Sequence, residues 1–279
     1  MLNPVQNPTS PVLIDGTTLD RSYAKLVKHI VEKQGKRISP LTFSVGAANA
    51  KEMLAGDGSL RTALDRALNT TNLKHRKDKS KTSPAYPVDI VAFTIFPKKY
   101  YDISDNLEDF FDHYRRAFPK LQARNRINSR GLYFERLIMY GSDGGGKPGQ
   151  FNGNQLEWFI NEHNSRTGVR ESMYQAAIFD PLRDHSRTAR LGFPCLHSIS
   201  FVPHKGNLTL NAFYPTQQIY RKAYGNYLGL INLGNFMAEH MRLNFCRLNV
   251  MVGVAKLDIA KTKGEFKDVY DASIDLLAN

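Results

Sequence analysis

The sequence is poor in cysteine, and this scarcity excludes several kinds of structure. Only Cys195 and Cys246 occur among 279 residues, too few for a disulfide framework. No pair of Cys or His residues has the spacing of a zinc site, so we predict no metal. A protein with so few thiols and no disulfide pattern is typical of a reducing compartment, and we expect this one to be cytoplasmic.

Long hydrophobic runs are also missing. No apolar stretch approaches the length of a membrane span, and residues 1–5 lack the basic-then-apolar pattern of a signal peptide. We therefore expect no membrane association. The composition is otherwise that of a globular protein, with 42% hydrophobic residues, 16 Phe and 13 Tyr, enough to bury a sizeable core. Because no internal repeat or linker interrupts the chain, we predict a single domain over residues 1–279.

Acidic residues are fewer than basic residues. The chain has 38 Lys and Arg against 26 Asp and Glu, a formal net charge of +12. An excess of this size favours an anionic partner, such as a nucleotide phosphate, an anionic cofactor or nucleic acid. Part of it lies in residues 74–84, which we predict to be a basic loop. Such a loop is either simply solvated or a patch that follows phosphates, and no RNA- or DNA-binding motif accompanies it.

Hydrophobic periodicity predicts an α+β fold. Residues 1–16 lack periodicity and are expected to form an irregular leader. The helix predicted at 226–241 is apolar on nearly all sides, which is typical of a buried central helix. The other helices are predicted at 20–34, 59–68, 107–118 and 154–164. Strands are predicted at 41–45, 88–96, 172–179, 196–202, 208–214 and 248–254.

The chemical interpretation depends on Cys195. It follows Pro194 at the start of a predicted hairpin that turns at Gly206 and ends at Tyr214, and Asn226 then opens the buried helix. A lone cysteine beside a core strand is most often a small buried hydrophobe. The alternative is a nucleophile activated by its surroundings.

The order of these residues resembles the thymidylate synthase family and its pyrimidine nucleotide hydroxymethylase relatives. In that family a Pro-Cys pair supplies the nucleophile, and an Asn at the start of a central helix reads the pyrimidine edge. The intervals from Asn226 to Ala238 and from Ala238 to Lys256 match those of the family. Three upstream segments also resemble its motifs: Tyr140-Gly141, Asn154-Gln155-Leu156 and Phe179-Asp180-Pro181. The resemblance covers roughly residues 130–260.

This resemblance implies both a fold and a reaction. The fold is one thymidylate-synthase-like α+β domain with a mixed sheet around a buried central helix, paired through the sheet into a homodimer. The reaction is transfer of a methyl or hydroxymethyl group to C5 of a pyrimidine nucleotide, with 5,10-methylenetetrahydrofolate as donor. Cys195 would add to C6, because C5 is a poor nucleophile until a thiolate does so. Asn226 would pair with a uracil-like N3–H and O4 edge, or would simply cap its helix.

Further site residues follow from the resemblance by position. Tyr140 would belong to a proton-relay network, with packing as the alternative. His197 would tune the thiol, with a place in the core or at an interface as the alternative. The arginine donated across the dimer would fall near Arg166 or Arg170, and we favour Arg170. Gln217 falls in the segment where the family binds substrate.

The sequence also departs from the family pattern. Pro215 and Thr216 stand where an Arg-Ser pair binds the 5′-phosphate, so the charge-assisted contact is lost; Arg221 and Lys222 lie a turn further on and could substitute for it. Lys256 and Asp258 replace the sugar-reading His and Tyr, and would contact the sugar or phosphate or form a surface ion pair. Residues 271–279 lack the short apolar end that closes over folate. Two interpretations therefore compete: an active one-carbon transferase, or a protein that has lost catalysis and acts as a nucleotide sensor or nucleic-acid-associated partner.

Overall fold

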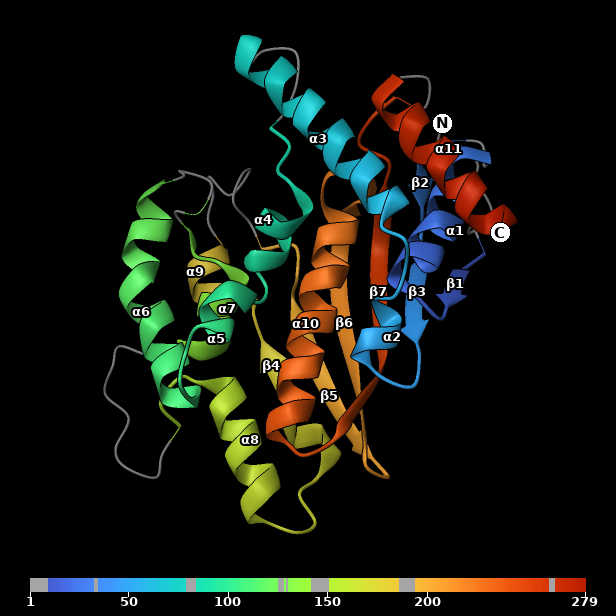
Figure 1. Cartoon of the computed structure of the whole chain (residues 1–279). Helices are drawn as coiled ribbons and strands as arrows, with labels where there is room; N and C mark the ends of the chain where they lie inside the picture. Colours follow the sequence, from blue (N-terminus) through green and yellow to red (C-terminus); the bar gives the residue numbers. More distant parts are fainter. Residues whose placement is uncertain are drawn as a thin grey trace, which may run out of the picture.

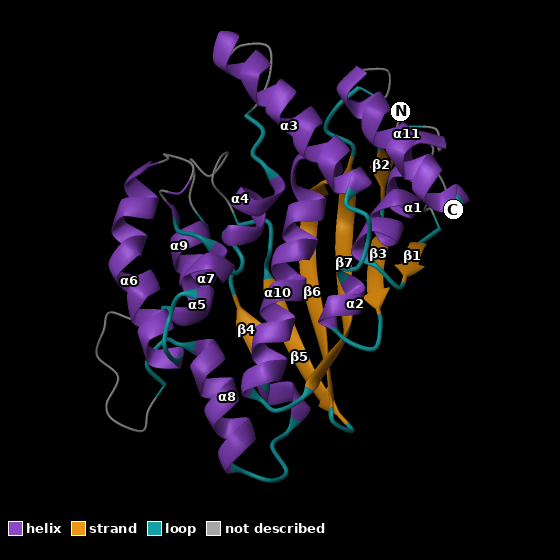
Figure 2. Cartoon of the chain, viewed as in Figure 1, coloured by secondary structure: helices purple, strands orange, loops and turns teal. Residues whose placement is uncertain are grey.

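The computed structural model describes residues 10–32, 35–78, 84–124, 128, 130–141, 151–185, 194–260 and 264–279. These residues form one α+β domain in which helices pack on a mixed, open sheet of seven strands (Figures 1 and 2). None of the helices within these ranges has the length and apolar character needed to cross a membrane.

The sheet has the strand order β1-β3-β7-β6-β5-β4, and the short β2 pairs with β7. The pairs β1–β3 and β6–β7 are parallel, and all other neighbouring pairs are antiparallel. The strands are β1 (Val12–Gly16), β2 (Arg37–Ile38), β3 (Leu41–Gly46), β4 (Gln175–Ala177), β5 (Ser198–His204), β6 (Asn207–Gln218) and β7 (Asn244–Lys256).

Eleven α-helices are present in the described part of the chain. They are α1 (Leu19–Glu32), α2 (Ala50–Met53), α3 (Ser59–Lys77), α4 (Val88–Phe93), α5 (Lys98–Asp102), α6 (Leu107–Arg124), α7 (Tyr133–Ile138), α8 (Gln155–Ser165), α9 (Pro181–Asp184), α10 (Tyr224–His240) and α11 (Gly264–Ala278). A 3₁₀ turn, η2 (Glu171–Met173), precedes β4, and a π-helical turn, η3 (Ile219–Ala223), joins β6 to α10.

Most of the elements predicted from periodicity are confirmed. The helices expected at 20–34, 107–118, 154–164 and 226–241 are α1, α6, α8 and α10, and the strands expected at 41–45, 196–202, 208–214 and 248–254 are β3, β5, β6 and β7. The central helix α10 is buried on nearly all sides, as its composition predicts. It crosses one face of β6 and β7 (Figure 1).

The strand predicted at 88–96 is wrong, because its first six residues form the helix α4. The β-branched and aromatic composition of this segment favours a strand, but tertiary contacts decide otherwise. The N–H of Val88 donates to Oδ1 of Asp65 at 2.8 Å, which satisfies a donor at the start of the helix. The helix then packs closely against Gly225 and Gly229 of α10.

The predicted basic loop at 74–84 is also partly wrong. The helix expected at 59–68 continues as α3 to Lys77, so the first four basic residues belong to its last turn. This end of α3 packs near α11, where Lys74 forms an ion pair with Glu265. Residues 79–83 lie outside the described ranges.

Both ends of the chain contain structure that the sequence pattern does not reveal. Part of the predicted leader 1–16 forms the edge strand β1, which pairs in parallel with β3; residues 1–9 lie outside the described ranges. The C-terminal segment forms α11, which packs against α1 and α3. Of the strand predicted at 172–179, only the three residues of β4 are extended in the sheet, after the turn η2.

The carboxyl ends of β6 and β7 and the start of β5 lie together at one edge of the sheet, the edge that is formed by strand ends and not by an outer strand. Ser198 pairs with Phe213 across β5 and β6, and Gln218 pairs with Lys256 across β6 and β7. Because η3 and α10 follow β6 directly, the first turns of the central helical segment lie at this same edge (Figure 1). The fold thus brings Cys195, which precedes β5, to the carboxyl ends of β6 and β7.

The pleat of β6 and β7 is interrupted at this edge. Side chains facing the core alternate as far as Tyr214, but the next buried one is Gln217. The same step occurs in β7, from Val252 to Ala255. The break lies at Gly253, where a Cβ atom would come within 2.8 Å of the carbonyl oxygen of Pro215, so only glycine fits. The interruption turns the polar side chain of Gln217 into the protein.

Candidate functional site

Cys195 lies between β4 and β5 and is held by its backbone. Its N–H donates to Oη of Tyr133, the first residue of α7, at 3.3 Å. The side chain is half-buried and packs against the hydrophobic core. The preceding residues 186–193, including the aromatic start of the predicted hairpin, lie outside the described ranges.

The surroundings of the Cys195 thiol have opposing effects on its charge. Burial raises its pKa, whereas a hydrogen bond with Thr216 and the positive charge of Lys222 lower it, and burial has the larger effect. The thiol is therefore mostly protonated at neutral pH. An additional interaction favouring the thiolate would be needed for efficient attack.

Lys222 brings the positive charge to this thiol from η3. Burial lowers the pKa of its ammonium, and the nearby Cys195 and Asp258 raise it. Nζ lies 5.2 Å from the centre of the Tyr86 ring, in cation–π geometry. Within the described ranges this ammonium has neither a hydrogen bond nor an ion pair.

The neighbouring cation, Arg221, is already paired with Asp258. Nη1 of Arg221 lies 2.9 Å from Oδ2 of Asp258 and donates to its carbonyl oxygen at the same distance. The other carboxylate oxygen, Oδ1, accepts from the N–H of Tyr220 at 2.9 Å. Burial raises the pKa of Asp258, and the Arg221 charge opposes this. Asp258 therefore anchors η3 to the end of β7, and both of its oxygens are engaged.

Three buried polar side chains in this region have unused hydrogen-bonding capacity. The hydroxyl of Tyr214, which is 0% exposed, and Nε2 of Gln217, which is 3% exposed, have no partner within the described ranges. Oε1 of Gln217 accepts from Oη of Tyr227 at 2.5 Å. The amide of Asn226, which is 4% exposed, forms no hydrogen bond with another described residue.

Asn226 does not cap the central helix. The backbone is already helical through η3, and Ala223 occupies the position before the first residue of α10. The helix-cap interpretation of Asn226 is therefore wrong. Since Asn226 follows Lys222 by four residues, the two side chains lie about one turn apart on the same side of this helical segment.

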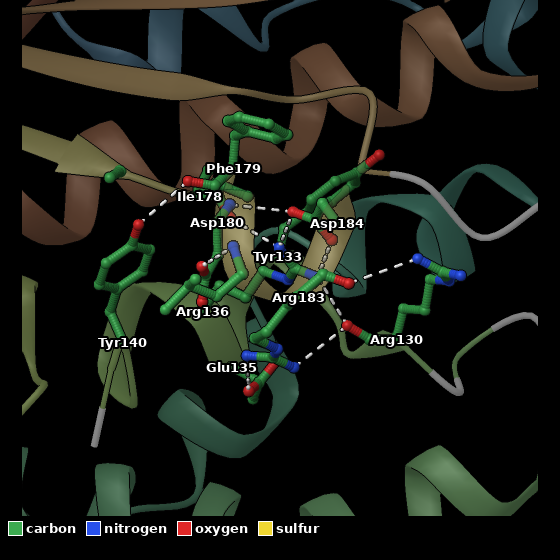
Figure 3. Close-up of polar contacts among 12 residues, drawn as sticks. Arg130, Tyr133, Glu135, Arg136, Tyr140, Ile178, Phe179, Asp180, Arg183 and Asp184 are labelled. Carbon is green, nitrogen blue, oxygen red and sulfur yellow. Dashed lines mark hydrogen bonds and ion pairs between the residues drawn. The ribbon is translucent and has the colours of Figure 1, made fainter. Parts of the chain in front are cut away.

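Tyr140, Phe179 and Asp180 lie in one hydrogen-bonded cluster (Figure 3), which Gln155 joins through Ala177. Oη of Tyr140 donates to the carbonyl oxygen of Phe179 at 3.0 Å, and burial raises its pKa. The side chain of Gln155 holds Ala177 from both sides: Oε1 accepts from its N–H, and Nε2 donates to its carbonyl oxygen, each at 2.8 Å. Asp180 caps α9 by accepting from the N–H of Leu182 at 2.9 Å.

His197 helps to hold the same cluster. Its ring stacks on Phe179 with 4.7 Å between ring centres. Its carbonyl oxygen accepts from the N–H groups of Ile178 and Phe179 at 2.9 and 3.0 Å. Burial lowers the pKa of the imidazole, which favours its neutral form. These contacts give His197 a packing role beside the site.

Arg170 and Lys256 are both on the surface of this protomer. Arg170 is exposed in the connection between α8 and η2. Lys256 is exposed at the last position of β7. The plainer interpretation of Lys256 and Asp258, a surface ion pair between the two, is wrong because Asp258 pairs with the half-buried Arg221.

The positions of Tyr133, Thr216 and Lys222 around Cys195 are the main features that the sequence leaves open. The sequence indicates Lys222 only as one of two cations after β6. No sequence pattern points to Tyr133. No group of three His, Cys, Asp or Glu side chains in the described ranges is arranged to hold a metal ion. Comparison of this chain with known protein families and with curated proteins finds no match.

Proposed function

We propose that this chain is a thymidylate-synthase-like transferase that adds a one-carbon unit, methyl or hydroxymethyl, to C5 of a pyrimidine nucleotide. The observation that carries the proposal is the meeting of Cys195 with Lys222 at the carboxyl ends of β6 and β7. The buried Asn226 amide, with no bond to another described residue, follows one turn along the helix. A nucleophile, a cation and an unused amide are the groups that such a substrate would require.

In this proposal each group has a separate task. Cys195 adds to C6 of the ring, which turns C5 into a nucleophile and develops negative charge on the base. Asn226 offers both a donor and an acceptor to the N3–H and O4 edge. Tyr140 belongs to the hydrogen-bonded network around Phe179. The family resemblance assigns it a role in proton relay. Gln217 contributes a buried N–H donor.

The one-carbon donor implied by the resemblance is 5,10-methylenetetrahydrofolate. The described residues give this cofactor little specific support, because the C-terminal segment is the helix α11, packed on α1 and α3. It does not supply a short apolar end that closes over a folate. The part of the reaction that this chain's own residues support is therefore the addition of Cys195 to C6.

A homodimer paired through the sheet is part of the proposal. On the face opposite α10, one row across four strands places Leu13, Thr42, Met251 and Phe213 side by side. Leu13 and Met251 are 67% and 53% exposed, which is unusual for large apolar side chains in a sheet. A second copy would bury this row, and Arg170, exposed on its own protomer, would be available to a partner.

The proposal is tested by the release of tritium from C5-labelled pyrimidine nucleotides, because addition to C6 labilises the hydrogen at C5 even without a one-carbon donor. UMP, dUMP, CMP and dCMP would each be incubated with the protein, with Cys195→Ala and, as a matched control, Cys246→Ala. Release from one nucleotide that is lost only in Cys195→Ala supports the proposal. Equal release by both variants, or no release at all, contradicts it.

A second candidate function is a nucleotide sensor or nucleic-acid-associated protein that has lost catalysis. The specific observation that favours it is the raised pKa of the Cys195 thiol, together with the engagement of both Asp258 oxygens by Arg221 and Tyr220. Such a protein would bind a nucleotide without releasing tritium, and its basic surface would serve an anionic partner. Equilibrium binding of the same four nucleotides separates this outcome from a protein that binds none of them.

A further inference from the structure

Unpartnered donors are concentrated in one short segment of the chain. Buried polar atoms without a hydrogen-bond partner in the described ranges include Oη of Tyr214, Nε2 of Gln217 and Nε of Arg221. Tyr214 and Gln217 lie at the end of β6 and Arg221 lies in η3, so all three fall within eight consecutive residues. An unsatisfied buried donor destabilises the folded protein, so a cluster of them marks a place where a ligand supplies the missing acceptors.

The chemistry of these atoms selects the ligand. Oε1 of Gln217 already accepts from Tyr227, so the unused side of this amide is its N–H donor. The hydroxyl of Tyr214 also donates readily. Burial is the main cause of the raised pKa of Tyr214, and the nearby Tyr133, Tyr227 and Cys195 add to it. The unused groups therefore present hydrogens, and the ligand that satisfies them is rich in acceptors.

Lys222 adds a full positive charge to this set. Its ammonium lies over the ring of Tyr86 and has no carboxylate partner in the described ranges, because both Asp258 oxygens are taken by η3. The charge of Asp258 acts on Lys222 without a direct ion pair, and a half-buried cation that no carboxylate contacts is costly. Binding an anion there would remove that cost. The Arg-Ser pair expected for phosphate is absent from β6, where Pro215 has no donor, so the cation reaches this region from η3 instead.

We propose that Lys222, together with the N–H of Gln217 and the hydroxyl of Tyr214, forms an oxyanion-binding subsite beside Cys195. The subsite takes a phosphate or a carboxylate group of the substrate. It rests on the proposed function for its role in catalysis, but the binding of an oxyanion does not depend on that reaction. Because one ammonium serves both the thiol and the anion, the bound anion withdraws its charge from Cys195 and occupies the space beside it.

Because Lys222 serves both the thiol and the anion, binding of an anion can be measured through the reactivity of Cys195, without a nucleotide. Iodoacetamide alkylates a thiolate, so the rate at which it modifies Cys195 reports on the charge and access of that thiol. The experiment uses the full chain carrying Cys246→Ala, so that a single thiol reacts. Rates would be measured across pH with and without inorganic phosphate, and in a second arm with acetate and malonate.

We expect saturating oxyanion to slow alkylation roughly tenfold and to move its pH profile upward. Protection by phosphate alone identifies a phosphate subsite, and protection by the carboxylates alone identifies a carboxylate subsite. Lys222→Met should abolish the protection, whereas Lys28→Met, at an exposed position of α1, should retain it. Lys222→Arg, which keeps the charge, should retain part of it, and it serves as the test if Lys222→Met does not fold.

Two results would overturn the inference. One is alkylation that neither phosphate nor a carboxylate slows. The other is protection that survives unchanged in Lys222→Met when its thermal melting shows a folded protein. Protection that depends on Lys222, combined with no tritium release from any nucleotide, would leave the oxyanion subsite standing while the transferase proposal fails.

Discussion

The guanidinium of Arg136 and the carboxylate of Asp184 form a two-pronged ion pair inside the protein. Nη1 donates to Oδ2 at 2.6 Å and Nη2 donates to Oδ1 at 2.8 Å, and the side chains are 2% and 0% exposed. The same guanidinium donates to the carbonyl oxygen of Ile178 at 2.8 Å, and Oδ2 of Asp184 accepts from the N–H of Asp180 at 2.9 Å. This pair therefore fixes the segment around Phe179 that supports Tyr140 (Figure 3), and His197 stacks on the same Phe179.

Replacing Arg136 by methionine should destabilise the protein strongly. The substitution leaves a buried carboxylate without its partner, which costs about 3–5 kcal/mol in comparable pairs. Urea denaturation at pH 7 measures the change in the free energy of unfolding. Asp89→Asn is the matched control, because it breaks an ion pair with Arg61 in which the side chains are 64% and 36% exposed; it should cost no more than about 1 kcal/mol. Equal losses would show that the buried pair has no special role.

This destabilisation should depend on pH. Burial opposes ionisation of Asp184, but its bonds to Arg136 and to the N–H of Asp180 outweigh this, and its pKa is lowered. A lowered pKa in the folded state stabilises the protein above the unfolded value, near 3.9, and the contribution is lost as pH falls through the folded value. In Arg136→Met the unpaired carboxyl favours its protonated form. The difference in unfolding free energy between wild type and variant should therefore narrow from pH 7 to pH 4, and a constant difference contradicts this explanation.

Alanine at Gly225 should destabilise the protein although alanine is the better helix former. A Cβ there would lie 2.6 Å from Cβ of Val91 and 2.9 Å from the carbonyl oxygen of Val88, so α4 would have to move. We expect a loss of about 1–3 kcal/mol in urea denaturation. Gly264→Ala, at the first position of α11 with no atom within 4 Å of the new Cβ, should instead be neutral or stabilising by up to about 1 kcal/mol. A stabilising Gly225→Ala would mean that α4 does not pack as described.

The dimer proposal predicts that a charge on the open face of the sheet separates the protomers. Met251→Asp places a carboxylate in the exposed apolar row, and sedimentation velocity should then find a monomer where the wild type is a dimer. Leu182→Asp, at a position of α9 that is 96% exposed, should leave the dimer intact. A wild-type monomer at micromolar concentration, or a dimer in both variants, contradicts pairing through this face.

Asn226→Asp should change which base reacts. A carboxylate offers only acceptors, so it suits the amino group of cytosine better than the O4 of uracil. We expect tritium release from uracil nucleotides to fall by about 10- to 100-fold, with a gain for cytosine nucleotides. Thermal melting checks that the variant is folded. An unchanged preference would remove Asn226 from base recognition.

The sequence predicts the long periodic elements and the order of the site residues, but not the contacts that arise between distant segments. The apolar central helix can be predicted because its composition is extreme from Tyr224 to His240. The helix α4 cannot, because its β-branched residues favour a strand until α10 presents Gly225 and Gly229 to it. Likewise, the pairing of Arg221 with Asp258 joins residues 37 positions apart. That pairing decides that Lys222, and not Arg221, remains available.

The central claim is that Cys195 is a nucleophile toward C6 of a pyrimidine nucleotide, and tritium release from the four C5-labelled monophosphates tests it most directly. The structure and the resemblance together predict release from a uracil nucleotide by the wild type and by Cys246→Ala, and none by Cys195→Ala. Release that persists in Cys195→Ala, or the absence of release from all four nucleotides by folded wild-type protein, would contradict the claim.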